Sequence, residues 1–113
     1  MPRDDATLFD IARAARLAIE FAADADYVTF VQDAKTQSAV LHQLMVIGEA
    51  VKRLSPEFRA GHPATPWTLI AGMRDKLIHA YDEVDLEQVW KTLQEDLPAL
   101  LAGLDASFPK DAG

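Results

Sequence analysis

The chain has 113 residues, a formal net charge of −7 and no cysteine. Its length suits one domain with its own hydrophobic core, and the lack of cysteine excludes disulfides, thiolate zinc sites and cysteine nucleophiles. Half of the residues are hydrophobic and only five are glycine, which favours helix over strand. We therefore predict an all-α fold, with residues 1–104 as a single helical domain and residues 105–113 as a flexible C-terminal tail.

The negative charge argues against nonspecific binding of nucleic acid, because neutralisation of phosphates supplies most of that affinity. Basic residues do gather in the middle third of the sequence, namely Lys52, Arg53, Arg59, Arg74 and Lys76. A local basic cleft on an acidic body is compatible with this distribution. The charged residues at the start precede no apolar signal segment, and no apolar run is long enough for a membrane span. We expect a cytoplasmic protein without a membrane partner.

The first helix is predicted to begin at Asp4 or Asp5, since either residue can cap it. Its apolar positions recur at spacings of three and four residues, at Leu8, Ile11, Ala15, Ala18 and Ala22. Residues 24–26 interrupt this pattern. Residues 27–31 are rich in β-branched and aromatic side chains and resemble a strand, but no second strand is evident for pairing. We therefore predict a connector with a short helical turn.

The second helix is predicted over residues 33–54. Its apolar stripe is broad enough to be buried on two sides, and it contains Val40, Leu41, Leu44, Met45, Ile47, Val51 and Leu54. Gly48, inside this helix, is predicted to allow a close approach of another helix or simply to be tolerated. Ser55 and Pro56 form an N-cap and first-turn pair for a short turn, and residues 62–66 are predicted to be a linker.

The third helix is predicted to open at Thr65, with Pro66 in its first turn, and to continue to about Tyr81. The fourth helix follows the connection 82–85, with Asp85 as its cap and Leu104 near its end. Proline removes one intrahelical hydrogen bond and clashes with the preceding turn, so Pro98 should bend or reset this helix. Four main helices with short loops predict an up-and-down four-helix bundle.

Arg74, His79 and Tyr81 combine a phosphate-binding group, a proton carrier and a modifiable hydroxyl within eight residues. Arginine offers a planar charged fork that suits phosphate, and histidine exchanges protons near neutral pH. On one regular helix, Arg74 and Tyr81 would lie about 20° apart, whereas Arg74 and His79 would lie about 140° apart. Either the helix ends by His79, or His79 faces a partner, for example across a two-fold dimer axis.

The remaining polar residues are assigned structural roles. His42 lies in the middle of the second helix and His62 precedes Pro63, so we interpret both as packed or solvated side chains. The acidic residues 82–87 are interpreted as a solvated turn that caps the next helix. The sequence contains no paired His, Cys or carboxylate spacing typical of a metal site, and we predict neither a metal nor another cofactor.

The spacing Arg74-x4-His79-x-Tyr81 resembles the R-x4-H-x-Y motif of the HepT-like toxins, a branch of the HEPN ribonuclease superfamily. Residues 46–55, 66–75, 84–90 and 96–98 resemble family blocks in the same order, and the resemblance covers residues 5–104. The commonest family member has asparagine where this chain has Asp75. The added carboxylate leaves Arg74 and His79 in place, although it could pair with Arg74 or alter RNA affinity.

The resemblance implies an HEPN-like helical bundle that forms a homodimer, with both motifs in one cleft. Arg74 would bind the scissile phosphate of an RNA substrate and His79 would act as general acid or base, without a metal. The chain would be the toxin of a type VII-like toxin–antitoxin system. Its antitoxin would be an MntA-like nucleotidyltransferase that silences it by AMPylation of Tyr81, as one partner in a hetero-oligomer.

A second interpretation makes the chain a non-catalytic module. In this case a helical dimer would bind a nucleotide, or present a substrate, for an associated nucleotidyltransferase. The acidic net charge and Asp75 favour this alternative.

Overall fold

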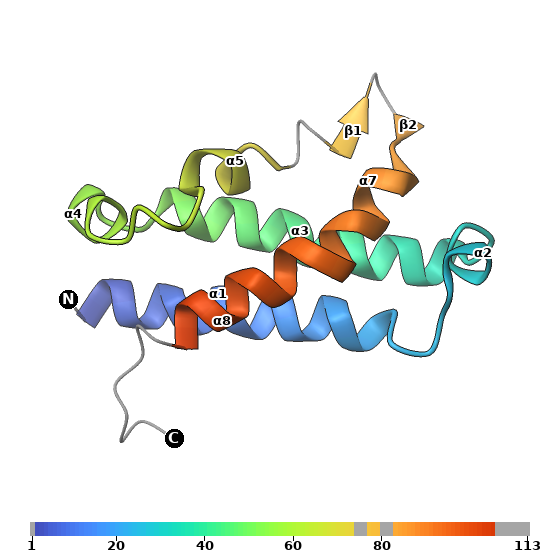
Figure 1. The fold of residues 1–113 in the computed structure, drawn as a ribbon, viewed down its shortest axis with the longest axis horizontal. Coiled ribbons are helices and arrows are strands. Elements are labelled where there is room, and N and C mark those ends of the chain that lie inside the picture. Colours follow the sequence, from blue (N-terminus) through green and yellow to red (C-terminus); the bar gives the residue numbers. More distant parts are fainter. Residues whose placement is uncertain (1, 74–76, 80–82, 106–113) are drawn as a thin grey trace.

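The computed structural model describes residues 2–73, 77–79 and 83–105, with side chains for residues 4–73, 77 and 83–104. These residues form a mostly helical structure. The two long helices α1 (Pro2–Phe21) and α3 (Ala34–Lys52) pack against each other in opposite directions, and α8 (Leu97–Asp105) packs on α1 (Figure 1). The predicted tail, residues 105–113, lies outside the described residues except for Asp105, which ends α8.

The start of α1 differs from the prediction. The helix already begins at Pro2, so neither Asp4 nor Asp5 is its cap. The buried carboxylate of Asp4 instead accepts hydrogen bonds from the backbone N–H of Ser55 at 2.9 Å and from its hydroxyl at 2.7 Å. A buried carboxylate needs such donors to offset the loss of water. Asp4 therefore joins the first turn of α1 to the distant start of α4.

The segment predicted as a short helical turn rather than a strand is the helix α2 (Tyr27–Phe30). Asp26 caps it by accepting a hydrogen bond from Thr29 N at 2.8 Å, and this bond lowers the pKa of the Asp26 carboxyl. Phe30 is fully buried and its ring lies 5.3 Å from that of Trp90. The aromatic residues that suggested a strand thus supply packing between helices.

The helix α3 agrees with its prediction at both ends to within two residues. Asp33 caps it, accepting hydrogen bonds from Thr36 Oγ1 at 2.6 Å and Thr36 N at 3.1 Å. These bonds lower the pKa of the Asp33 carboxyl. Gly48 is buried in the middle of α3, where a Cβ atom would lie 3.5 Å from the Ala71 carbonyl oxygen and 3.6 Å from that of Ile70. Gly48 therefore marks a close helix approach, as predicted.

Two substitutions at Gly48 should distinguish the effect of helix propensity on stability from the effect of the limited room between α3 and α5. A methyl group would make ordinary van der Waals contacts, so Gly48→Ala should leave the free energy of unfolding unchanged or raise it by up to about 1 kcal/mol. Gly48→Leu should lower it by about 1–3 kcal/mol, because the larger side chain must displace the α5 backbone. Thermal and urea unfolding measure both effects. Equal stability of the two variants would contradict this account of the helix contact.

The helix α4 (Pro56–Ala60) has the predicted start, since Ser55 accepts a hydrogen bond from Phe58 N at 3.1 Å and Pro56 occupies the first turn. The predicted linker 62–66 is a packed corner. The His62 ring stacks on that of Phe58 at 4.1 Å and hydrogen-bonds the Phe58 carbonyl oxygen at 2.8 Å. The indole N–H of Trp67 donates to the His62 carbonyl oxygen at 3.0 Å. His62 thus has the structural role that its position predicted.

The predicted third helix is wrong in both its cap and its length. The helix α5 (Trp67–Ala71) ends at Gly72, and Pro66 precedes it without a side-chain capping bond, so Thr65 is not the cap. Instead of continuing to Tyr81, the chain reaches the strand β1 (Ile78–His79), which pairs antiparallel with β2 (Glu83–Val84). The predicted helical fold is confirmed in its main part, since the described residues are mostly helical, and the short ladder of Ile78 and His79 with residues 83–84 is the departure from it.

The predicted fourth helix is present with an irregular middle. Asp85 caps α7 (Leu86–Lys91) by accepting from Gln88 N at 3.1 Å. A π-helical turn, η1 (Thr92–Asp96), then leads into α8, and the Leu97 N–H donates to the Thr92 carbonyl oxygen five residues back. This wider turn directly precedes Pro98, which has no N–H to donate. The reset predicted at Pro98 is therefore confirmed.

The hydrophobic core lies between α1, α3 and the α7 to α8 segment. Its alanines on α1 let the two long helices approach closely. Fully buried members include Leu8, Ile11, Ala15, Ala18, Val40, Leu44, Ile47, Val51, Val89 and Leu97. Within the part of the chain that the structure describes, no helix has the length and apolar character needed to cross a membrane.

Candidate active site

The three residues of the predicted site differ in how far the structure describes them. Arg74 and Tyr81 lie outside the described residues, and the backbone of His79 lies in β1. The extended backbone at His79 overturns the helical-wheel angles, since they assumed one regular helix from Arg74 to Tyr81. Of the two alternatives drawn from the sequence, the structure has the first, in which the helix ends by His79.

The chain on either side of Arg74 is anchored in the core. Met73 and Leu77 both have helical backbone, and their side chains are buried. Just before them, α5 packs on α3 at Gly48 (Figure 1). Met73 and Leu77 are thus two buried anchors, one before and one after residues 74–76 in the sequence.

His79 is positioned through the backbone of its strand. Ile78 pairs with Val84, and His79 pairs with Glu83. The backbone N–H of Asp85 donates to the Leu77 carbonyl oxygen at 2.8 Å, beside this ladder. Because Asp85 also caps α7 with its side chain, the strand that carries His79 is tied both to the core at Leu77 and to the next helix. The acidic turn that the sequence indicated has this capping role at Asp85, and Glu83 and Glu87 are exposed.

Substitution of Asp85 tests whether this connection positions His79. Asp85→Ala removes the cap and should lower the free energy of unfolding by about 1 kcal/mol, whereas Asp85→Asn should keep most of it. If the cap orients the ladder, Asp85→Ala should also lower the rate of the RNA cleavage that the family resemblance implies, and Asp85→Asn should restore it. Asp26→Ala, which removes the cap of α2, is the matched control and should affect stability alone. A cleavage rate that is unchanged in Asp85→Ala would contradict the positioning role.

Two grooves flank α5, and sequence periodicity did not indicate either of them. One groove, of about 210 Å³, lies between α5 and the η1 to α8 segment, and its lining is mostly apolar. Its walls include Leu69, Ile70, Met73, Leu97 and Leu100, and of the described residues that line it Asp96 alone is charged. Leu69 is 65% exposed, which is unusual for a large apolar side chain next to a groove.

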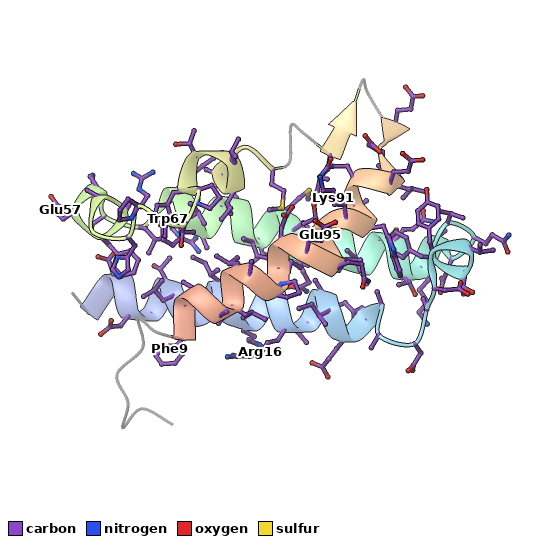
Figure 2. All side chains as sticks on the ribbon, viewed as in Figure 1. Phe9, Arg16, Glu57, Trp67, Lys91 and Glu95 are labelled. Atoms are coloured by element: carbon purple, nitrogen blue, oxygen red, sulfur yellow. The ribbon has the colours of Figure 1, made fainter. Side chains whose placement is uncertain are left out.

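The other groove lies between α4 and α5 and has a volume of about 500 Å³. Arg59, Thr65 and Thr68 give it polar groups, and Trp67 lies at the junction of α4 and α5 (Figure 2). Arg59 belongs to the basic group that the sequence indicated. Two other members of that group, Lys52 and Arg53, are exposed near the end of α3, and Lys52 forms an ion pair with Glu49 at 3.4 Å.

Comparison with known proteins decides the family. The family model described as ribonuclease HepT-like matches residues 11–106. The chain belongs to the HepT-like ribonuclease family. This result confirms the resemblance drawn from the motif and its surrounding blocks, and it makes the chain a member of a family of ribonucleases.

Individual members of the HepT-like family agree with this assignment. A protein of Thermococcus cleftensis named "Probable ribonuclease HepT" is 48% identical over 93 residues, which cover 82% of this chain and 84% of that protein. Two proteins of Methanocaldococcus jannaschii, named "Putative RNase MJ0127" and "Putative RNase MJ0125", are each 41% identical. These matches cover 87% and 88% of this chain, and 83% and 88% of the respective relatives. No solved structure matches this chain.

Proposed function

We propose that this protein is a metal-independent endoribonuclease and the toxin of a type VII-like toxin–antitoxin system. The observation that carries the proposal is the family match over residues 11–106, which includes the spacing of Arg74, His79 and Tyr81. Further support comes from the backbone of His79, which the ladder and Asp85 hold next to the core. Such anchoring suits a residue that must meet a reacting atom in a fixed geometry.

In this mechanism the ribose 2′-oxygen of the RNA attacks the adjacent phosphorus. His79 accepts the 2′-hydroxyl proton as the P–O2′ bond forms, and a protonated imidazole gives a proton to the 5′-oxygen as the P–O5′ bond breaks. Arg74 stabilises the charge that develops on the nonbridging oxygens. The products are a 2′,3′-cyclic phosphate and a 5′-hydroxyl end.

The proposed active form is a homodimer of HEPN-like up-and-down four-helix bundles with both motifs in one cleft. Two copies of His79 would then be available, one as the base and one as the acid. An apolar groove is lined by Met73 and by the exposed Leu69, which supports an interface in which the second protomer covers this surface next to the motif in sequence. An interface here would bury apolar area close to the segment that it must bring together.

The proposed regulator is an MntA-like nucleotidyltransferase antitoxin that transfers AMP to Tyr81. Transfer joins the tyrosine oxygen to the α-phosphorus of ATP and releases pyrophosphate. The bulky anionic group on Tyr81 would repel RNA and compete for Arg74. Toxin and antitoxin would associate as a hetero-oligomer for this reaction.

Cleavage of a defined RNA by the purified protein, with a chelator present, tests the catalytic proposal. We expect cleavage products that end in a cyclic phosphate. The non-catalytic alternative, a dimer that binds a nucleotide or a partner for the nucleotidyltransferase, predicts copurification with that enzyme and no RNA turnover. Absence of turnover at every protein concentration would overturn the proposal in favour of that alternative.

A further inference from the structure

We propose that the groove between α4 and α5 is a second phosphate subsite, in which Arg59 binds the RNA backbone next to the scissile position. This inference rests on the proposed ribonuclease function and extends it. The groove is separate from the motif in sequence, because Arg59 lies 15 residues before Arg74. It would therefore contribute to holding the RNA strand rather than to the chemical step.

The lining of the groove fits a phosphate group. Of the described residues that line it, Arg59 alone is charged, and Thr65 and Thr68 add two hydroxyl groups. No carboxylate lines this groove within the described residues, although the chain as a whole has a net charge of −7. Hydroxyl and guanidinium groups are common donors to the oxygens of a nucleic-acid backbone.

Among the described residues, no acidic side chain pairs with Arg59. Its side chain forms no ion pair or hydrogen bond with any residue in the described ranges, and its Nε atom is buried without a partner there. Lys52 differs, since Glu49 lies 3.4 Å from its ammonium group. The guanidinium group of Arg59 lines the groove, and its planar fork suits two oxygens of one phosphate.

Charge favours this groove over the neighbouring apolar groove, with which it shares Thr65, Pro66 and Leu69. Asp96 lines the apolar groove between α5 and the η1 to α8 segment, and its carboxylate would repel phosphate. The α4 to α5 groove lies along a helix of five residues, about 7.5 Å long at the helical rise. Gly72 and Met73 follow α5 and directly precede Arg74 in the sequence, so the proposed subsite lies on the element that leads to the motif.

The test is the salt dependence of RNA binding, measured by fluorescence anisotropy with a labelled single-stranded oligoribonucleotide. A His79→Ala background prevents cleavage during the measurement. Arg59→Ala should weaken binding and reduce the slope of log K against log salt concentration by about 0.7, the value for one phosphate contact on a single strand. Between 50 and 200 mM salt, its affinity deficit should therefore shrink about 2.6-fold. Arg59→Lys should keep most of the slope but bind more weakly than arginine.

Arg13→Ala is the matched control, because it removes the same charge from an exposed position on α1, on the opposite side of α3 from α5 (Figure 1). Its slope should equal that of the parent. RNA binding with the same slope in Arg59→Ala and Arg13→Ala would overturn the subsite and leave the ribonuclease proposal standing. Binding that depends on Arg59 without cleavage by the wild type would overturn the ribonuclease proposal alone. No RNA binding by any variant would overturn both.

Discussion

Induced expression of the wild-type chain should arrest growth, whereas His79→Ala should abolish this arrest and reduce RNA cleavage by about 10²- to 10⁴-fold. The reason is that the imidazole is the group proposed to accept the 2′-hydroxyl proton and to protonate the leaving oxygen. Arg74→Ala should also remove the growth arrest, since the charge on the phosphate oxygens would lose its counterion. Colony counts after induction and single-turnover cleavage of a labelled RNA measure the two effects.

The control for this experiment is folding. If His79 were a packing residue, the substitution would lower the melting temperature together with the activity, whereas a catalytic role predicts lost activity in a protein that melts like the wild type. Arg13→Ala again provides a charge-matched variant that should remain fully toxic, because Arg13 is exposed on α1. Equal toxicity of wild type, His79→Ala and Arg74→Ala would falsify the proposed nuclease mechanism.

Coexpression with the proposed nucleotidyltransferase antitoxin should add one or more AMP groups to Tyr81 and make the purified protein inactive toward RNA. Each AMP brings a phosphate close in sequence to Arg74, where it competes with the substrate and repels it. Mass spectrometry of the peptide that contains Tyr81 measures the modification, and cleavage of a labelled RNA measures the loss of activity.

Tyr81→Phe separates modification from catalysis. This variant lacks the acceptor oxygen, so it should remain toxic when the nucleotidyltransferase is present and should carry no AMP at position 81. The second tyrosine, Tyr27, lies in α2 and provides the internal control, because Tyr27→Phe should leave silencing intact. Silencing of Tyr81→Phe to the same extent as the wild type would show that the antitoxin acts by another route.

Local signals in the sequence predicted much of the helical structure. Ser55 and Asp85 cap the helices that follow them, as predicted, because a capping side chain bonds a backbone N–H only two or three residues away. Pro98 similarly acts on the turn before it. These interactions depend on neighbours in sequence and therefore can be read without the tertiary structure.

The errors arose where tertiary contacts override the local pattern. Ile70, Met73 and Leu77 have helical spacing, which favoured one helix through the motif, but Ile78 and His79 pair with residues 83–84. Asp4 resembled a cap, yet its carboxylate binds Ser55, 51 residues away. Neither pairing leaves a signal in a single sequence.

The candidate site could likewise be predicted from the sequence only in part. The order and spacing of Arg74, His79 and Tyr81 were available from the sequence, as was the family that they indicate. The two grooves were not, because each is formed by segments that packing brings together. Arg59 appeared in the sequence as one of several basic residues, and its distinct environment between α4 and α5 emerges from the fold.

The hydrogen bonds between Asp4 and Ser55 make the start of α4 depend on the first turn of α1. Ser55 donates two hydrogen bonds to the Asp4 carboxylate and also caps α4, the helix that carries Arg59. Deletion of the first four residues would leave the Ser55 N–H and hydroxyl without this acceptor. A change at Asp4 would thus disturb the cap of α4, and with it the α4 side of the α4–α5 groove, more than fifty positions further along the chain.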